Sequence, residues 1–179
     1  MINHKFKIKQ KLLIILVFLF TLNCSQNKDS YYFKFDNVEH YSIDIEEGEL
    51  FDLETKKNLK KNEQLKIDII INNKPEKLSD SLFVLKLTTI GFSKQEVSKE
   101  KFRELNEIFR EKSHDEVYAL ACIHVYRDLL IFKKSDSIIG IAKICFSCLD
   151  SQIVGTNSNT MAFGQSGDYG KLKRLLKRK

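Results

Sequence analysis

Apolar and polar residues in the first half of the chain follow patterns that predict several strands. Residues 31–45 are rich in aromatic and β-branched residues and partly alternate, which predicts a strand or a pair of strands. Residues 65–71 predict another strand, which ends at a turn containing the only proline, Pro75. Residues 46–63 are highly charged and are predicted to form a solvated loop or edge. Residues 78–90 fit a helix or a strand equally well.

A helix is predicted over about residues 98–112. Ser98 is a favourable N-cap residue, and the charged side chains that follow fall on one side of the helix. The opposite side carries apolar residues at helical spacing, which is typical of a helix packed against a sheet. These residues are Phe102, Leu105, Ile108 and Phe109.

The second half of the chain predicts a β-hairpin, a long loop and a terminal helix. Two β-prone segments, residues 116–132 and 137–146, are joined by a short polar turn and form the clearest hairpin of the sequence. Residues 150–170 hold four of the seven glycines and predict a long loop. The last nine residues predict a short basic helix that docks Leu172, Leu175 and Leu176 on the core, with contact between its cations and anionic lipid as the alternative.

Together these elements predict a single α+β domain over residues 31–179. Its expected architecture is an antiparallel sheet of about five or six strands, with the 98–112 helix on one face and the short basic helix at the C-terminal end. The length of 179 residues suits one domain, and 42% hydrophobic residues excludes an intrinsically disordered chain.

The first 23 residues have the pattern of an export signal. Four lysines and no acidic residue occur in residues 1–11, and residues 12–22 are apolar apart from Thr21. Eleven helical residues span roughly 16 Å, which is about half of the hydrocarbon core of a bilayer. The segment therefore predicts a cleaved signal peptide over residues 1–23 and not a permanent membrane anchor.

Cys24 follows the apolar run directly, in the sequence Leu-Phe-Thr-Leu-Asn-Cys-Ser. Residues 1–24 resemble bacterial lipoprotein precursors. The resemblance implies cleavage before Cys24, acylation of that cysteine, and, through Ser25, an outer membrane lipoprotein of a Gram-negative bacterium that faces the periplasm or the cell surface. Residues 24–30 would then be a polar tether between the membrane and the domain. The alternative is an ordinary secreted protein in which Cys24 has no special role.

The net charge changes once the signal peptide is removed. The full chain has 30 basic and 24 acidic residues, and the four leader lysines reduce the basic count to 26, a net charge of +2. Six of these basic residues lie in the last nine positions, so residues 24–170 carry 20 basic and 24 acidic side chains. A mildly acidic, exported body with no recognisable binding module argues against a nucleic-acid partner.

Three cysteines and one histidine form the one group of residues in the sequence that suggests a disulfide, a metal site or a redox function. If the predicted hairpin turns near Ser135, opposed residues have numbers that sum to 270, so Cys122 faces Cys148 and His124 faces Phe146. Cys145 precedes Cys148 by three residues, and a shift of register still leaves this group together. The candidate disulfide or metal residues are Cys122, His124, Cys145 and Cys148.

Four interpretations of this group remain open. A structural disulfide is favoured, because an exported protein meets an oxidising compartment. The others are buried thiols that act as small apolar side chains, a tetrahedral Zn²⁺ site made by the four residues, and thiol redox exchange. A redox Cys-x-x-Cys motif usually opens a helix, whereas a loop is predicted here after Cys148. No cofactor other than this possible zinc is expected.

Residues 122–176, which include the sequence Ile-Cys-Phe-Ser-Cys, resemble a segment of small exported bacterial proteins whose activity is not known. The resemblance implies that the three cysteines form a set. Phosphate loops, metalloprotease helices and serine hydrolase motifs are not found in the sequence. We therefore expect a membrane-anchored envelope lipoprotein that acts as a non-enzymatic binding or structural module with an envelope protein as partner. A thiol-redox or zinc-binding protein is the alternative.

Overall fold

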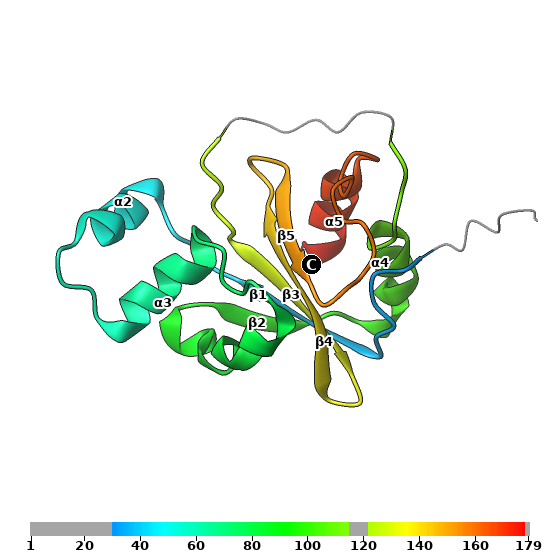
Figure 1. Cartoon of the computed structure of the whole chain (residues 1–179), viewed down its shortest axis with the longest axis horizontal. Helices are drawn as coiled ribbons and strands as arrows, with labels where there is room; N and C mark the ends of the chain where they lie inside the picture. Colours follow the sequence, from blue (N-terminus) through cyan, green and yellow to red (C-terminus); the bar gives the residue numbers. More distant parts are fainter. Residues whose placement is uncertain (1–29, 115–121, 178–179) are drawn as a thin grey trace, which may run out of the picture.

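A computed structural model of the chain describes residues 30–114 and 122–177, which form an α+β fold around one antiparallel sheet (Figure 1). The sheet has five strands in the order β2-β1-β3-β4-β5, and every neighbouring pair is antiparallel. This confirms the predicted fold class. The strands are β1 (Asn37–Ser42), β2 (Ser93–Glu96), β3 (Asp128–Lys134), β4 (Ser137–Cys145) and β5 (Asp150–Val154).

Helices cover both faces of the sheet (Figure 1). One face carries α2 (Glu47–Thr55), α3 (Lys61–Ile70) and the 3₁₀ helices η1 (Leu78–Lys86) and η2 (Thr88–Ile90). The other face carries α4 (Phe102–Ile108), which continues from η3 (Lys99–Lys101), and α5 (Asp168–Leu176). A central sheet with two covered faces explains why β3 and β4 are nearly continuous runs of buried residues.

The core on the α4 and α5 face confirms two sequence predictions. The apolar side of the predicted helix packs on the sheet, with Leu105, Ile108 and Phe109 almost completely buried. The three leucines of the C-terminal helix are also buried in this core, so α5 docks on the sheet as predicted. Gly140 is required here, because a Cβ atom at this position would overlap the ring of Phe33, which stacks on Phe132.

Residues 65–71 form no strand, which corrects the prediction made for them. They belong almost entirely to α3, whose start is stabilised by a 2.8 Å hydrogen bond from the backbone N–H of Lys60 to Oε2 of Glu63. The isoleucines favour a strand by propensity, but as a helix the segment buries Ile67, Ile69 and Ile70 against the sheet. Tertiary packing outweighs an intrinsic preference that is worth only a few tenths of a kcal/mol per residue.

Residues 46–63 are not simply a solvated loop, which is a second correction. They contain α2 and the start of α3, and Leu50 of α2 is buried in the core. One buried residue among charged ones gives a helical pattern too weak to recognise in the sequence. The ambiguous residues 78–90 form η1 and η2.

The predicted helix over residues 98–112 is confirmed in its centre but ends early, since its last residue is Ile108. Phe109 leaves the helix, and its carbonyl accepts a 2.9 Å hydrogen bond from the N–H of Tyr32. The chain therefore turns away to join the segment that leads into β1.

The β3–β4 hairpin is confirmed, with a register that differs from the prediction. At the turn, Lys134 pairs with Ser137, so the numbers of opposed residues sum to 271 and not to 270. A bulge between Phe132 and Lys133 shifts the pairing by one more residue, so Phe132 pairs with Gly140 and not with Ile138. Ser135 and Asp136 form the turn with positive φ angles, as a two-residue hairpin turn requires.

The long loop predicted over residues 150–170 is wrong at its start. Residues 150–154 are β5, which pairs with β4 from Cys145–Asp150 to Ile141–Val154. The backbone hydrogen bonds of an existing neighbour make a strand of residues whose own preference is weak. Among residues 30–114 and 122–177, no helix combines the length and the apolar character needed to cross a membrane.

Candidate functional site

Residues 122–127, the described segment before β3, contain two of the predicted site residues, Cys122 and His124. A strand is predicted from residue 116, but β3 begins only at Asp128, and residues 115–121 lie outside the described residues. In the irregular stretch between, the N–H of Tyr126 donates to the carbonyl of Ile70 at 2.8 Å, and that of Val125 approaches Sγ of Cys145 at 3.4 Å. The first bond ties the stretch to the end of α3, and the second contact brings it to the end of β4.

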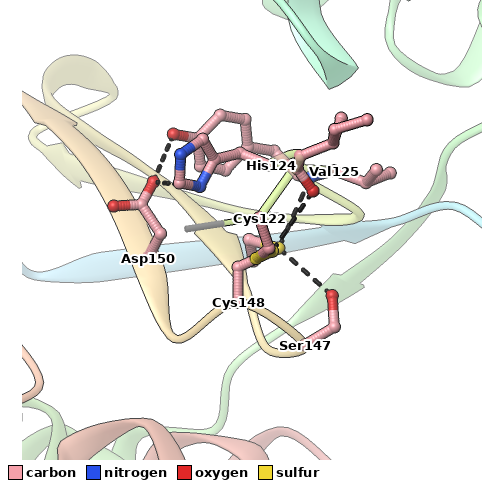
Figure 2. Close-up of a disulfide and its surroundings, with 9 residues drawn as sticks. Cys122, His124, Val125, Ser147, Cys148 and Asp150 are labelled. Carbon is pink, nitrogen blue, oxygen red and sulfur yellow. Dashed lines mark hydrogen bonds and ion pairs between the residues drawn. A yellow bond between two sulfur atoms is a disulfide. The ribbon is translucent and has the colours of Figure 1, made fainter. Parts of the chain in front are cut away.

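Cys122 and Cys148 form a disulfide (Figure 2). Cys148 lies in the turn between β4 and β5, and the two Cα atoms are 6.1 Å apart, within the usual range for a disulfide. The bond ties the segment before β3 to the far end of β4, 26 residues later. The hairpin argument predicted this proximity, although Cys122 lies outside the ladder from which it was derived.

His124 lies beside the disulfide and next to a carboxylate, and not opposite Phe146 as the register predicted (Figure 2). Its Nδ1 atom is 3.2 Å from Oδ2 of Asp150, the first residue of β5. The imidazole ring also stacks on Tyr126, with 6.2 Å between centroids and 14° between the ring planes. The Tyr126 hydroxyl donates to the same Asp150 oxygen, and burial together with this bond raises the pKa of Tyr126.

The structure brings together three of the four predicted candidates. One ligand atom from each of Cys122, His124 and Cys148 lies within 4.8 Å of the other two. Cys145 is a free, fully buried thiol in a small cluster with Tyr126 and Cys148, and it does not belong to this group. Its Sγ atom lies 3.3 Å from Oγ of Ser147. In the oxidised state the two cysteines form a covalent cross-link beside His124. In the reduced state the same group would consist of two thiols and an imidazole.

Lys143 was not singled out from the sequence. It lies on β4 with its side chain completely buried, and its ammonium group donates to the carbonyl oxygens of Asn72 at 2.6 Å and Lys74 at 3.0 Å. The ammonium also lies 4.4 Å from the centroid of the Tyr126 ring. Burial lowers the pKa of Lys143 to about 7, and the charge of Asp150 opposes the shift. A lysine inside the apolar run Ile-Ile-Gly-Ile-Ala-Lys-Ile-Cys was the available signal.

A second site is a groove of about 810 Å³ between α3, the turn at residues 72–76 and η1. Lys143 holds one wall of it through the turn, and Gln152 of β5 adds hydrogen bonds to the carbonyls of Asn73 at 2.8 Å and Pro75 at 2.9 Å. No pattern in the sequence indicated this groove, because most of α3 was predicted as a strand. The charged side chains that line it are Lys61, Lys74, Lys86, Asp68, Glu76 and Asp80.

Two exposed leucines of η1 lie beside this groove. Leu82 lines it and is 77% exposed, and Leu85 follows it on η1 with 81% exposure. Side chains three residues apart eclipse on a 3₁₀ helix, so both leucines project from the same side of η1. Phe83 and Val84 of the same helix are buried in the core.

Cys24 lies outside the described residues, so the structure carries no information on its predicted lipidation. Comparisons of the chain with protein-family models, with curated proteins and with solved structures found no significant match.

Proposed function

We propose that this chain is a membrane-anchored envelope lipoprotein whose domain is a non-enzymatic binding module, with the groove between α3 and η1 as its binding surface. Lipidation at Cys24 would hold the domain at the outer membrane of a Gram-negative bacterium, on the periplasmic or the outer side. The observation that carries the binding role is the pair of exposed leucines, Leu82 and Leu85, beside a groove fixed to the sheet.

The composition of the groove favours a protein partner. Three lysines and three acidic residues line it, so its charges balance and give no attraction for a polyanion. Exposed apolar side chains next to mixed charges are typical of a protein-binding surface, where the apolar contacts supply most of the free energy and the polar rim supplies selectivity.

The disulfide supports the proposed location outside the cytoplasm independently of the groove. A disulfide in a single domain favours an oxidising environment such as the bacterial periplasm or the cell surface. This agrees with the export pattern of residues 1–23, which does not depend on Cys122 or Cys148.

A crosslinking experiment tests the binding role. The full chain, expressed in its native envelope, is treated with a bifunctional crosslinker and compared with the double variant Leu82→Ser, Leu85→Ser. We expect a discrete crosslinked protein partner with the wild type and at least a tenfold loss of it in the variant, because two exposed apolar contacts disappear.

The matched control is Met161→Ser, which changes a 75% exposed apolar side chain in the 155–167 loop. Met161 lies two residues before Phe163, which is buried on the α4 and α5 face, and it does not line the groove, so this change leaves the groove intact. An equal loss of the partner in both proteins would show that the groove is not the binding surface.

A thiol or metal function is the alternative, and the convergence of Cys122, His124 and Cys148 favours it. It is compatible with the binding role, because the groove and this group share no residue.

A further inference from the structure

We propose that Cys122, His124 and Cys148 form a zinc site that exists only when the Cys122–Cys148 disulfide is reduced, with Asp150 as the fourth ligand. The same two sulfur atoms would then serve as a covalent brace in one redox state and as metal ligands in the other. The proposal does not depend on the groove or on lipidation at Cys24.

The positions of the ligand atoms fit a tetrahedral ion. Zinc binds thiolates at about 2.3 Å and imidazole nitrogens at about 2.0–2.1 Å, so neighbouring ligand atoms are roughly 3.3–3.8 Å apart. The atoms of Cys122, His124 and Cys148 already lie within 4.8 Å of one another. Once the disulfide opens, the sulfurs need only separate to roughly 3.8 Å. Cys122 is exposed, so rotation of its side chain can provide that movement.

The imidazole of His124 has a nitrogen that the fold leaves without a hydrogen bond. Nδ1 is buried, and the described residues supply no hydrogen-bond partner for it. Its ion-pair neighbour is Oδ2 of Asp150 at 3.2 Å. Two ligands about 2.0–2.2 Å from a tetrahedral zinc are separated by roughly 3.3 Å, so this spacing suits two atoms that share an ion. In the zinc-bound state Nδ1 would be unprotonated and would direct its lone pair at the ion.

Asp150 is not one of the three residues whose ligand atoms already converge, and it is assigned through its contact with His124. The Tyr126 hydroxyl donates to the carboxylate and holds its orientation, as outer hydrogen bonds do for the ligands of metal sites. Two thiolates, one carboxylate and one neutral imidazole would carry three negative charges, which a divalent ion largely compensates.

Reduction of the disulfide precedes zinc binding. A dithiol reductant transfers two electrons and two protons to the disulfide, which leaves the Cys122 and Cys148 thiols and a disulfide in the reductant. Zn²⁺ then binds both sulfurs and His124, and the two thiol protons pass to water. Oxidation reverses the sequence: the sulfur–sulfur bond forms again, a disulfide acceptor takes the two electrons and two protons from water to become a dithiol, and the zinc is released.

Cobalt serves as a spectroscopic probe for this site. The purified chain is titrated with Co²⁺ as isolated, and again after reduction with a phosphine and anaerobic removal of the reductant. We expect no cobalt spectrum from the oxidised protein. The reduced protein should bind one equivalent with the intense visible bands of a tetrahedral ion and a thiolate charge-transfer band, and Zn²⁺ should abolish both. A reduced wild type that leaves cobalt in its hydrated form would overturn the proposal.

Variants identify the ligands. Cys148→Ser leaves one thiolate, so it should weaken both Co²⁺ binding and the charge-transfer band, and His124→Gln and Asp150→Asn should each weaken Co²⁺ binding by roughly 10–100-fold. Cys145→Ser is the matched control and should bind as the wild type does, because Cys145 lies outside the group. His124→Gln and Asp150→Asn can still form the disulfide, so their oxidised forms show whether they fold. Loss of binding in Cys145→Ser, with none in His124→Gln, would refute this ligand set.

Discussion

The charged side chain of Lys143 is buried in the interior of the domain. Its side chain is completely buried, and its partners are two backbone carbonyls and the face of Tyr126. The carbonyls belong to the turn that forms one wall of the groove. The same lysine therefore joins β4 to the proposed binding surface and makes the free energy of unfolding depend on its protonation.

The stability of the folded domain should rise with pH above neutrality. Burial lowers the pKa of Lys143 to about 7, whereas an unfolded lysine has a pKa near 10.5, so the unfolded chain binds more protons between these values. The free energy of unfolding should therefore increase by roughly 2 kcal/mol from pH 7 to pH 9, and this gain should disappear as the pH falls through 7.

Urea unfolding of the wild type and of Lys143→Met at both pH values measures this effect. The variant lacks the titrating group, so its free energy of unfolding should change much less between pH 7 and pH 9. Identical pH dependence in the two proteins would show that the ammonium retains an ordinary pKa in the folded state.

Glu39 connects three strands of the sheet. It lies on β1 with a buried carboxylate, and its Oε1 atom accepts hydrogen bonds from Lys133 of β3 at 2.6 Å and from Lys94 of β2 at 2.7 Å. The Tyr41 hydroxyl donates to Oε2 at 3.1 Å. Burial alone would raise the pKa of Glu39, but the two lysine hydrogen bonds outweigh it and hold the pKa below its usual value.

Replacing Glu39 by Gln should destabilise the sheet by roughly 2–3 kcal/mol at pH 7. The substitution removes the negative charge from two lysines, while the amide oxygen still accepts one hydrogen bond. Because the folded pKa of Glu39 is lowered, its stabilising effect is complete above about pH 4.5 and is lost as the pH falls through the folded value. Denaturant unfolding at pH 7 and pH 3 should therefore show a smaller difference between the two proteins in acid.

Glu54→Gln is the control, since it makes the same change at an exposed position on α2. It should alter the free energy of unfolding by less than about 0.5 kcal/mol. A Glu39→Gln protein as stable as this control would mean that the buried network contributes no net stability.

The proposed tether would determine how far from the membrane the domain lies. Only five residues lie between Cys24 and Ser30, and the six steps from one to the other span at most roughly 20 Å. Ser30 is fixed to the domain by its carbonyl, which accepts the N–H of Glu111 at 2.9 Å, and by its hydroxyl, which lies 2.6 Å from that of Ser158. A lipid on Cys24 would therefore keep this end of the domain close to the membrane surface.

The tether is tested by detergent-phase partition of the protein expressed from its full sequence. The wild type should enter the detergent phase, because two or three acyl chains bind a membrane almost permanently. Cys24→Ala should move to the aqueous phase, and Cys145→Ala, which changes a cysteine in the folded core, should remain with the wild type. Detergent partition that is unaffected by Cys24→Ala would contradict lipidation.

The structure confirms those sequence predictions that depend on strong local patterns. The apolar face around Leu105 is confirmed, as are the β3–β4 hairpin and the leucines of α5, because each periodicity requires one buried side. The same reasoning failed for α3, where isoleucines favour a strand and only contact with the sheet makes a helix preferable.

Local patterns along the chain were enough to predict the class of the fold and the presence of the β3–β4 hairpin, but not the register of its strands. They also predicted that Cys122 lies near Cys148, although Cys122 is outside the paired residues of the hairpin. Tertiary structure alone decided that His124 meets Asp150, that Cys145 stays apart and that Lys143 supports a groove. These contacts join side chains from separate elements. Their positions follow from how two layers of helices pack on the sheet, and no periodicity along the chain encodes that packing.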